Sequence, residues 1–341
     1  MRKKIFLGLA LIVVAFCVIN CKSIRYGLTQ AKGQYKIIKE SRPIQDFVDD
    51  PAYPDSLKSK LLIVQAIKKY CKDSLGLVSG DNYTEMFDQK GKPGMWVVTA
   101  SDPFELKSYQ WSFSFLGDFS YKGYFEKEKA LALQKELKAQ GYDTDVAEVN
   151  AWSTLGWFTD PVMSSMLKKS EARLARVLIH EITHYNIFVK NDISYNENLA
   201  MFIGDMGALK YLQDKYGENA QEVQELNDYL HDIGLFTSYL VAKSAELNQF
   251  YKDSLGTDSI ANVQLKKAKI KSIVIELSEQ NFRGKHLLKK IQEQADKVNN
   301  CFFTDFLTYK EKSAEMEIDF KTKCNSDVKQ YIDAQKEKHG I

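Results

Sequence analysis

Apolar residues recur with helical spacing in two early segments of the chain. The segment PDSLKSKLLIVQAIKKYCKDSLGL (54–77) carries one apolar stripe, made by Leu57, Leu61, Val64, Ile67 and Cys71. This stripe predicts an amphipathic helix. The segment KEKALALQKELKAQG (127–141) predicts a second helix, and Gly141 marks its end.

The second half of the chain is almost wholly helical in its pattern. From Ser170 onward apolar residues keep the helical period. The stretch 218–341 is long, charged and amphipathic, with breaks near LGTDS (255–259) and NFRG (281–284). We therefore expect several long helices after Ser170.

Three short runs with β character precede the helical half. They are bounded by turn residues and read GMWVVTA (94–100), QWSFSFLG (110–117) and DVAEVNA (145–151). Together the patterns predict an α+β fold, mostly α, with a small antiparallel sheet before a helix pair and a long helical C-terminal part. The predicted divisions are a signal at 1–21, an N-terminal α+β region at 22–165, the helix pair at 166–216 and a helical C-terminal region at 217–341.

The N-terminus has the pattern of an export signal. A basic MRKK is followed by the apolar run IFLGLALIVVAFCVI (5–19), which is short for a bilayer span of about twenty residues. Cys21 follows, near the pattern in which that cysteine is lipidated in a bacterial lipoprotein. Asn20 departs from the small residue usual before it, and an uncleaved signal anchor is the alternative. We expect an exported, lipid-anchored protein on the periplasmic side of a bacterial membrane.

Composition narrows the class of protein. Hydrophobic residues are 44% and charged residues 27% of 341 residues, which suits a globular protein with a sizeable core. A net charge of +2, without a basic stripe or nucleic-acid motif, gives no case for a nucleic-acid partner. If Cys21 carries lipid, Cys71, Cys301 and Cys324 remain. Their spacing fits no zinc–thiolate site, and we interpret them as buried small apolar residues.

The segment RVLIHEITHYNIF (176–188) carries the candidate chemistry. On a helix, His180 and His184 lie on one face a turn apart, so both can aim an imidazole nitrogen at one ion. Glu181 is offset around the helix, where it can reach a water on that ion. Zinc lowers the pKa of such a water toward about 7, and a carboxylate can then take its proton. His-Glu-x-x-His occurs by chance in about one chain in a hundred of this length.

A catalytic zinc needs three protein ligands and one open position. The next predicted helix, SYNENLAMFIGDMGALKYL (194–212), offers Glu197, because the apolar residues after it place its neighbourhood in the core. Asp205, two turns later, is the alternative ligand, or an acceptor for a histidine N–H. We favour Glu197 over Asp205.

The chain resembles a bacterial family of predicted zinc aminopeptidases, many of them lipoproteins, within the broad gluzincin group. The blocks that carry the resemblance run from about Gly33 to Tyr309 in the family's order. They are GQYKIIKESRPI, NYTEMF, QWSFSFLGDFSYKGYF, AWSTLGWFTDPVMSSML, HEITHYNIFVKNDISYNENLAMFIGDMG and NNCFFTDFLTYKE. The resemblance implies zinc ligation by His180, His184 and Glu197 and a general-base role for Glu181. The gap from His184 to Glu197 is shorter than in thermolysin-like enzymes, so the resemblance to the family is closer than the resemblance to the wider group. Because aminopeptidase is itself largely a predicted label in this family, the resemblance supports a zinc peptidase more strongly than an exopeptidase.

Other residues near the motif have weaker interpretations. The apolar segment STLGWFTDP (153–161) is either a loop packed under the helix or the wall of a substrate subsite. Three tyrosines are candidate oxyanion donors: Tyr121, Tyr124 and Tyr309. We expect Tyr185 in the core.

Two functions from different classes fit these observations. The first is a zinc metallopeptidase acting on peptides, with aminopeptidase activity. The second is a non-enzymatic envelope lipoprotein that binds a partner through its C-terminal helices. Glu181 separates the two, because a structural metal site has no use for a carboxylate next to its histidine ligand.

Overall fold

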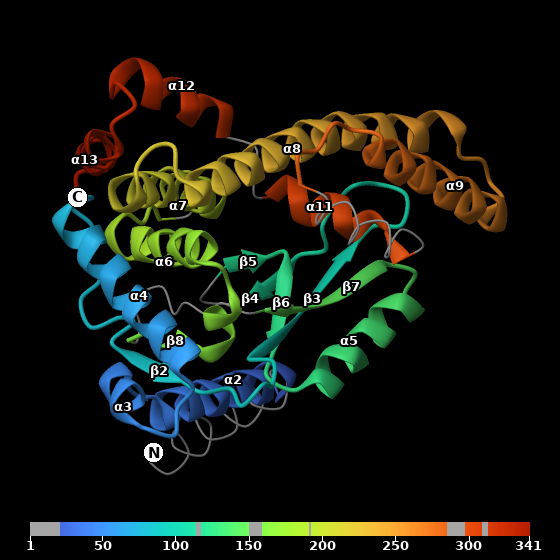
Figure 1. Ribbon diagram of the computed structural model, residues 1–341. Coiled ribbons are helices and arrows are strands. Elements are labelled where there is room, and N and C mark those ends of the chain that lie inside the picture. Colours follow the sequence, from blue (N-terminus) through green and yellow to red (C-terminus); the bar gives the residue numbers. More distant parts are fainter. Residues whose placement is uncertain (1–20, 114–116, 150–158, 191, 285–296, 309–312) are drawn as a thin grey trace, which may run out of the picture.

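The computed structural model describes residues 21–113, 117–149, 159–190, 192–284, 297–308 and 313–341 (Figure 1). Among these residues helices predominate, and the strands form three small sheets. The predicted α+β fold, mostly α, is therefore confirmed.

The N-terminal elements pack at one end of the main core. They are α2 (Cys21–Glu40), β1 (Arg42–Pro43), α3 (Ile44–Asp49) and α4 (Asp55–Asp73). The apolar stripe of α4 is buried from Leu61 to Cys71, as its period predicts, and Leu57 lies at the edge. No helix was predicted at α2, where the sequence shows only a polar stretch around Gly33–Gln34. The packed side of α2 includes Gln34 and its exposed side includes Leu28, so its apolar residues do not mark its buried face.

The sheets are more divided than the sequence predicts. In one sheet β3 (Met95–Ser101) lies between β6 (Tyr121–Tyr124) and β7 (Asp143–Val149), antiparallel to both. The run at 110–117 gives a separate hairpin, β4 (Trp111–Phe113) with β5 (Gly117–Phe119). A third sheet joins β1 to β2 (Glu85–Phe87), which pairs in parallel with β8 (Val162–Met163). The helix α5 (Lys127–Ala139) covers β3 and β7, and Gly141 follows it with a positive φ of 93° that suits glycine.

The predicted helix pair forms the centre of the molecule. After the short 3-10 helix η1 (Ser164–Lys168), α6 (Glu171–Asn186) begins at Ser170, whose hydroxyl accepts a hydrogen bond from the Arg173 N–H. The helix α7 (Ile193–Tyr216) is capped in the same way by Asp192. The ridge Leu174, Leu178 and Ile182 of α6 is fully buried, as its period predicts.

Polar contacts fix the register of α6 against α7, which run antiparallel. At one end Glu171 accepts hydrogen bonds from Lys215 at 2.6 Å, Tyr211 at 2.7 Å and Tyr216 at 2.8 Å. Burial alone would raise the pKa of Glu171, but these bonds outweigh it and hold that pKa below its usual value. In the middle of the pair Arg176 forms an ion pair with Asp205. The contacts at both positions fit only one alignment of the helices.

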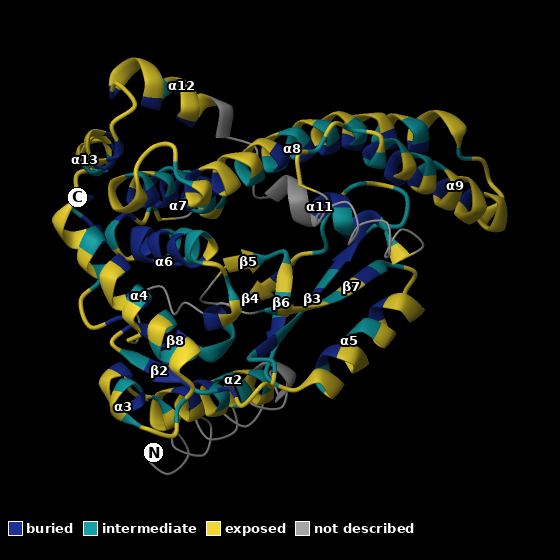
Figure 2. Cartoon of the chain, viewed as in Figure 1, coloured by how far each residue is buried: buried dark blue, intermediate teal, exposed yellow. Residues whose placement is uncertain are grey.

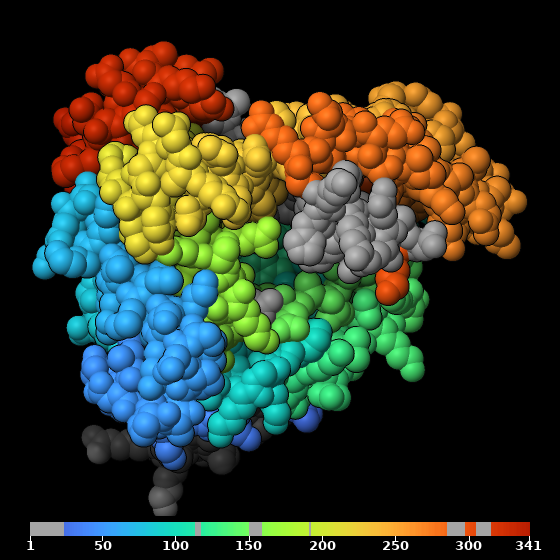
Figure 3. Space-filling model, in the orientation of Figure 1, coloured from blue at the N-terminus to red at the C-terminus, as the bar shows by residue number. Residues whose placement is uncertain are grey.

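The C-terminal helices complete two cores (Figure 2). They are α8 (Gln221–Ser254), α9 (Ser259–Ser278), α11 (Asn300–Thr308), α12 (Ser313–Lys323) and α13 (Val328–His339). The main core joins α2, α3, α4, α6 and α7 to α8, α12 and α13, while α8, α9 and α11 share a second one. The α8–α9 hairpin extends beyond the rest of the chain as an arm (Figure 3). The divisions at 165 and 216 stay predictions.

The three cysteines Cys71, Cys301 and Cys324 are buried. Their interpretation as small apolar core residues is confirmed.

We predict that two glycines in helices respond oppositely to alanine. A Cβ on Gly204 of α7 would lie 2.9 Å from the Arg176 carbonyl oxygen and 3.2 Å from the His180 Cβ, so Gly204→Ala must push α7 off α6. We expect a loss of about 1–3 kcal/mol in the free energy of unfolding. Gly234 of α8 has no atom within 4 Å of such a Cβ, and Gly234→Ala should be neutral or stabilise by up to about 1 kcal/mol. Urea unfolding of both variants measures this, and equal stability of the two would contradict the close contact.

Candidate metal centre

Three side chains of the helix pair converge on one point. His180 and His184 project from the same face of α6, and Glu197 comes from the second turn of α7. The two Nε2 atoms are 3.1 Å apart. The carboxylate of Glu197 lies 3.6 Å from Nε2 of His180 and 3.3 Å from Nε2 of His184. Residues that the sequence separates by up to 17 positions therefore form one group, which could hold a metal ion.

The spacing of the donor atoms fits a tetrahedral ion. A tetrahedral zinc with bonds of 2.0–2.1 Å holds neighbouring donors about 3.3 Å apart. The three distances in this group scatter around that value. Two imidazoles and one carboxylate are also the donor types of catalytic zinc sites, and they leave a fourth position open. The residues present fit zinc in both number and chemistry.

The charge of Glu197 supports cation binding. Burial alone would raise the pKa of Glu197, but hydrogen bonds with His180 and His184 lower it to about 2. The carboxylate is therefore ionised. His184 is buried, and its Nδ1 has no hydrogen-bond partner among the described residues. Both rings thus present Nε2 to the shared point, with Nδ1 of His184 directed away from it.

Glu181 lies beside the group without joining it. Burial raises the pKa of Glu181, His180 and His184 lower it, and Glu197 and Asp160 raise it again. These interactions place Glu181 in the electrostatic neighbourhood of the three donors. The His-Glu-x-x-His pattern, from which this position of Glu181 was predicted, lies entirely within α6.

A buried segment next to Glu181 was not singled out from the sequence. Tyr83 is fully buried, and the charges of Glu181 and Asp160 add to burial in raising its pKa. The Tyr83 N–H donates to the Asp160 carbonyl at 2.7 Å, and the Asp160 N–H donates to Asn82 at 2.8 Å. Tyr83 also has a positive φ of 58°, which is uncommon for a bulky residue and marks a strained backbone. The one available signal was the presence of NYTEMF among the family-like blocks.

Asp205 has a different partner. Its carboxylate is bound by the guanidinium of Arg176, which lies over the Tyr229 ring at 4.9 Å. Asp205 is not part of the three-residue group, although its charge adds to that of Glu197 in raising the pKa of His180 against the effect of burial. The carboxylate that converges with both histidines is that of Glu197.

The tyrosines considered as oxyanion donors have different surroundings. Burial raises the pKa of Tyr121, and the charge of Glu197 raises it further, so the two groups interact electrostatically although 41% of the residue surface is exposed. Tyr124 instead packs against Tyr26, with ring centroids 5.5 Å apart. Tyr185 is exposed and its hydroxyl lies against Gly80, so the expectation of a core position is wrong. Tyr309 and most of the apolar segment at 153–161 lie outside the described residues.

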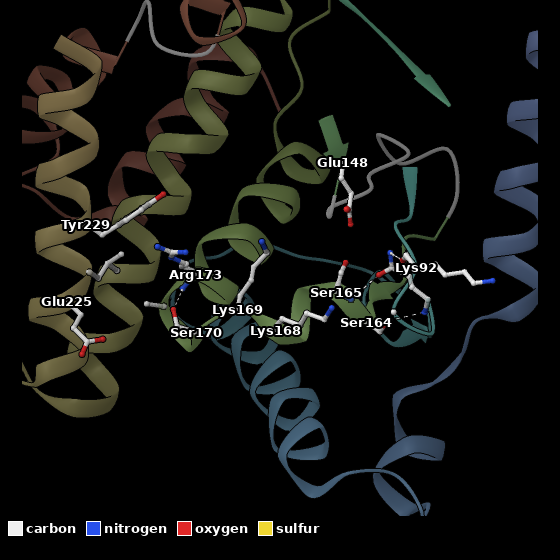
Figure 4. A pocket seen from close by; sticks show the side chains of 14 residues that line it. Lys92, Glu148, Ser164, Ser165, Lys168, Lys169, Ser170, Arg173, Glu225 and Tyr229 are labelled. Atoms are coloured by element: carbon white, nitrogen blue, oxygen red, sulfur yellow. Dashed lines mark hydrogen bonds between the residues drawn. The ribbon is translucent and has the colours of Figure 1, made fainter. Parts of the chain in front are cut away.

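A separate cavity of about 600 Å³ opens at the start of α6 (Figure 4). Its charged lining residues are Lys92, Lys168, Lys169, Arg173, Glu148 and Glu225. None of the four candidate site residues lines it, so this cavity is not the metal centre. His180 and His184 lie further along α6.

Comparison with known proteins places the chain in a family. The family model "Putative aminopeptidase" matches residues 25–339, which include α2 through α13 almost entirely. No curated protein and no solved structure matches the chain. Since the match covers nearly all of the sequence, the chain belongs to the putative aminopeptidase family.

Proposed function

We propose that this protein is a zinc-dependent metallopeptidase with aminopeptidase activity. The observation that carries the proposal is the convergence of His180, His184 and Glu197, with Glu181 beside them. The family match supports the aminopeptidase class. A role limited to binding a partner would not require a carboxylate at position 181.

The ligands of the zinc would be Nε2 of His180, Nε2 of His184 and the carboxylate of Glu197. When bound, zinc supplies Lewis acidity, which polarises a carbonyl and makes water a better nucleophile at neutral pH. The ionised Glu197 offsets part of the positive charge of the ion. The open side of the group is left for substrate.

Glu181 would act as the general base. It would take a proton from the attacking water and return it to the amine that leaves when the peptide bond breaks. The position of Glu181 suits this role, because Glu181 follows the proposed ligand His180 directly and is not itself one of the three proposed ligands. The Tyr121 hydroxyl would donate a hydrogen bond to the oxygen of the peptide carbonyl as negative charge develops there.

The site of action would be outside the cytoplasm. The basic and apolar run at 1–19 is the pattern of an export signal, and Cys21 would carry the lipid anchor. Two or more acyl chains hold a protein stably on a membrane, whereas one chain does not. The peptides hydrolysed would therefore be those of the periplasm.

Matched variants separate the proposed ligand from its neighbour. Glu197→Gln replaces a charged metal donor by a neutral amide. Loss of a residue that hydrogen-bonds a metal ligand typically lowers metal affinity by about 10–100-fold, and we expect a larger fall in zinc retention here, because Glu197 is itself a proposed ligand. His180→Ala should do the same. Asp205→Asn should have little effect, because Asp205 binds Arg176. Zinc content after dialysis against a graded chelator measures this. The reverse ranking of the two acidic positions would transfer the ligand role to Asp205.

Glu181→Gln tests the enzyme directly. Gln keeps the shape of the side chain and leaves the ligands in place but cannot accept a proton. We expect normal zinc content and a fall of about 10²–10⁴-fold in peptide turnover. The assay compares a free-amine peptide with its N-acetylated copy at equal zinc occupancy. Cleavage of the free-amine peptide alone would support an aminopeptidase, equal cleavage of both would indicate an endopeptidase, and a fully active Gln variant would refute the role of Glu181.

Tyr121→Phe and Tyr124→Phe form a second matched pair. Both remove a hydroxyl from β6, but of the two only Tyr121 has its pKa raised by the charge of Glu197. Loss of an oxyanion donor lowers kcat by about 10²–10³-fold, and we expect that fall for Tyr121→Phe with KM little changed. Tyr124→Phe should keep wild-type kcat. Equal effects of the two substitutions would exclude a specific role for Tyr121.

A further inference from the structure

The helix α2 packs on the protein with one face. Tyr26 and Gln30 each donate a hydrogen bond to the Gly123 carbonyl at 3.0 Å. Ile37 is buried in the main core, and Gly33 lies against the ring of Phe125. These contacts determine which side of α2 points outward.

The outward side carries a continuous apolar stripe. Its large apolar residues are well exposed: Ile24 over 38% of its surface, Leu28 over 67%, Tyr35 over 63% and Ile38 over 42%. With Ala31 they are spaced alternately four and three residues apart, so they form one line along the helix. Single exposed apolar residues are common on proteins, but a contiguous stripe marks a surface that meets another molecule or a membrane.

A basic flank accompanies the stripe. It consists of Arg25, Lys32, Lys36 and Lys39. Each of these residues directly follows a residue of the stripe in the sequence, so the four lie together on one side of the stripe. None of the four forms an ion pair with a described residue, and Lys39 lies over the Tyr35 ring at 5.9 Å. Positive charge next to exposed apolar residues complements an anionic lipid surface.

We infer that α2 lies along the surface of a bilayer that contains anionic lipids, with Leu28 and Tyr35 inserted among the headgroups. The apolar run at 5–19, which we propose as an export signal, ends two residues before α2 and would bring this helix to a membrane. Within the described part of the chain, no helix has both the length and the apolarity to cross a bilayer. An apolar stripe on one side of a helix, flanked by basic residues, suits contact with the surface of a bilayer. This contact does not depend on lipidation of Cys21 or on peptidase activity.

Contact along α2 would orient the whole molecule. Figure 1 shows α2 along the lower edge and the α8–α9 arm along the upper edge. The arm would therefore project away from the membrane. Ile260 at the start of α9 is 75% exposed and gives a control position with an apolar side chain far from the stripe.

Photo-crosslinking of the full-length protein tests the inference. The photoreactive residue p-benzoylphenylalanine replaces Leu28, Tyr35 or Ile260 in protein reconstituted into vesicles of phosphatidylcholine with phosphatidylglycerol. All three positions are exposed, so the substitutions leave the core unchanged. After irradiation, mass spectrometry identifies what each position has captured. We expect lipid adducts at positions 28 and 35 and only background at position 260.

Charge variants complete the experiment. Lys32→Glu with Lys36→Glu, or vesicles of phosphatidylcholine alone, should reduce the lipid adducts at position 28. Unchanged yields in both arms would overturn the role of anionic lipid. Capture of a second copy of the chain at positions 28 and 35 would overturn the lipid contact in favour of a dimer. Equal lipid capture at position 260, or no adduct at any position, would overturn it as well.

Discussion

The register between α6 and α7 is the constraint on which the candidate site depends. Glu171 meets Lys215 at one end of the antiparallel pair, Arg176 meets Asp205 in the middle, and the histidines meet Glu197 at the other end. A shift of α7 by one residue would turn Glu197 about 100° around its helix and remove it from the histidines. Gly204 permits the close approach, because its missing Cβ leaves room for the Arg176 carbonyl. Interactions distant from the metal group therefore determine whether that group exists.

The same arrangement explains how a polar cluster lies next to a core. Leu174, Leu178 and Ile182 bury one side of α6, while the neighbouring side presents the donor atoms. Burying a carboxylate without a partner is costly, and Glu197 avoids that penalty through its contacts with both histidines. Where two neutral imidazoles and an ionised carboxylate meet at one point, they offer more lone pairs there than they have protons to form hydrogen bonds. A cation at that point would satisfy all three at once, so the group could hold a metal ion.

Local features were predictable from the sequence, and long-range pairings were not. The helix α6 and the common face of His180 and His184 follow from spacing within one segment. Glu197 was favoured because apolar residues follow it, and the structure brings it to the histidines. The pairing of Asp205 with Arg176 joins residues 29 positions apart on two helices, which no periodicity reveals. The approach of Tyr83 to Glu181 likewise depends on how α4 and the β2 sheet pack against α6.

The errors have a shared physical origin. The helix α2 was missed because its packed side carries Gln34 and its exposed side carries Leu28, which inverts the usual relation of apolarity to burial. The β-like runs were identified, but strand pairing is non-local, and one run joined a separate hairpin. Tyr185 was expected in the core because it follows the motif on the side of the helix that faces away from the metal. On the helix, however, it projects beyond the buried ridge toward Gly80.

X-ray absorption at the zinc K-edge of the purified full-length protein tests the central claim most directly. The proposed site gives a zinc shell of light atoms at about 2.0–2.2 Å, with the multiple-scattering pattern of two imidazoles and no sulfur. That result would match the donor set of His180, His184 and Glu197, because none of the three contains sulfur and two are histidines. A shell with sulfur at about 2.3 Å, or one without imidazole scattering, would contradict the claim.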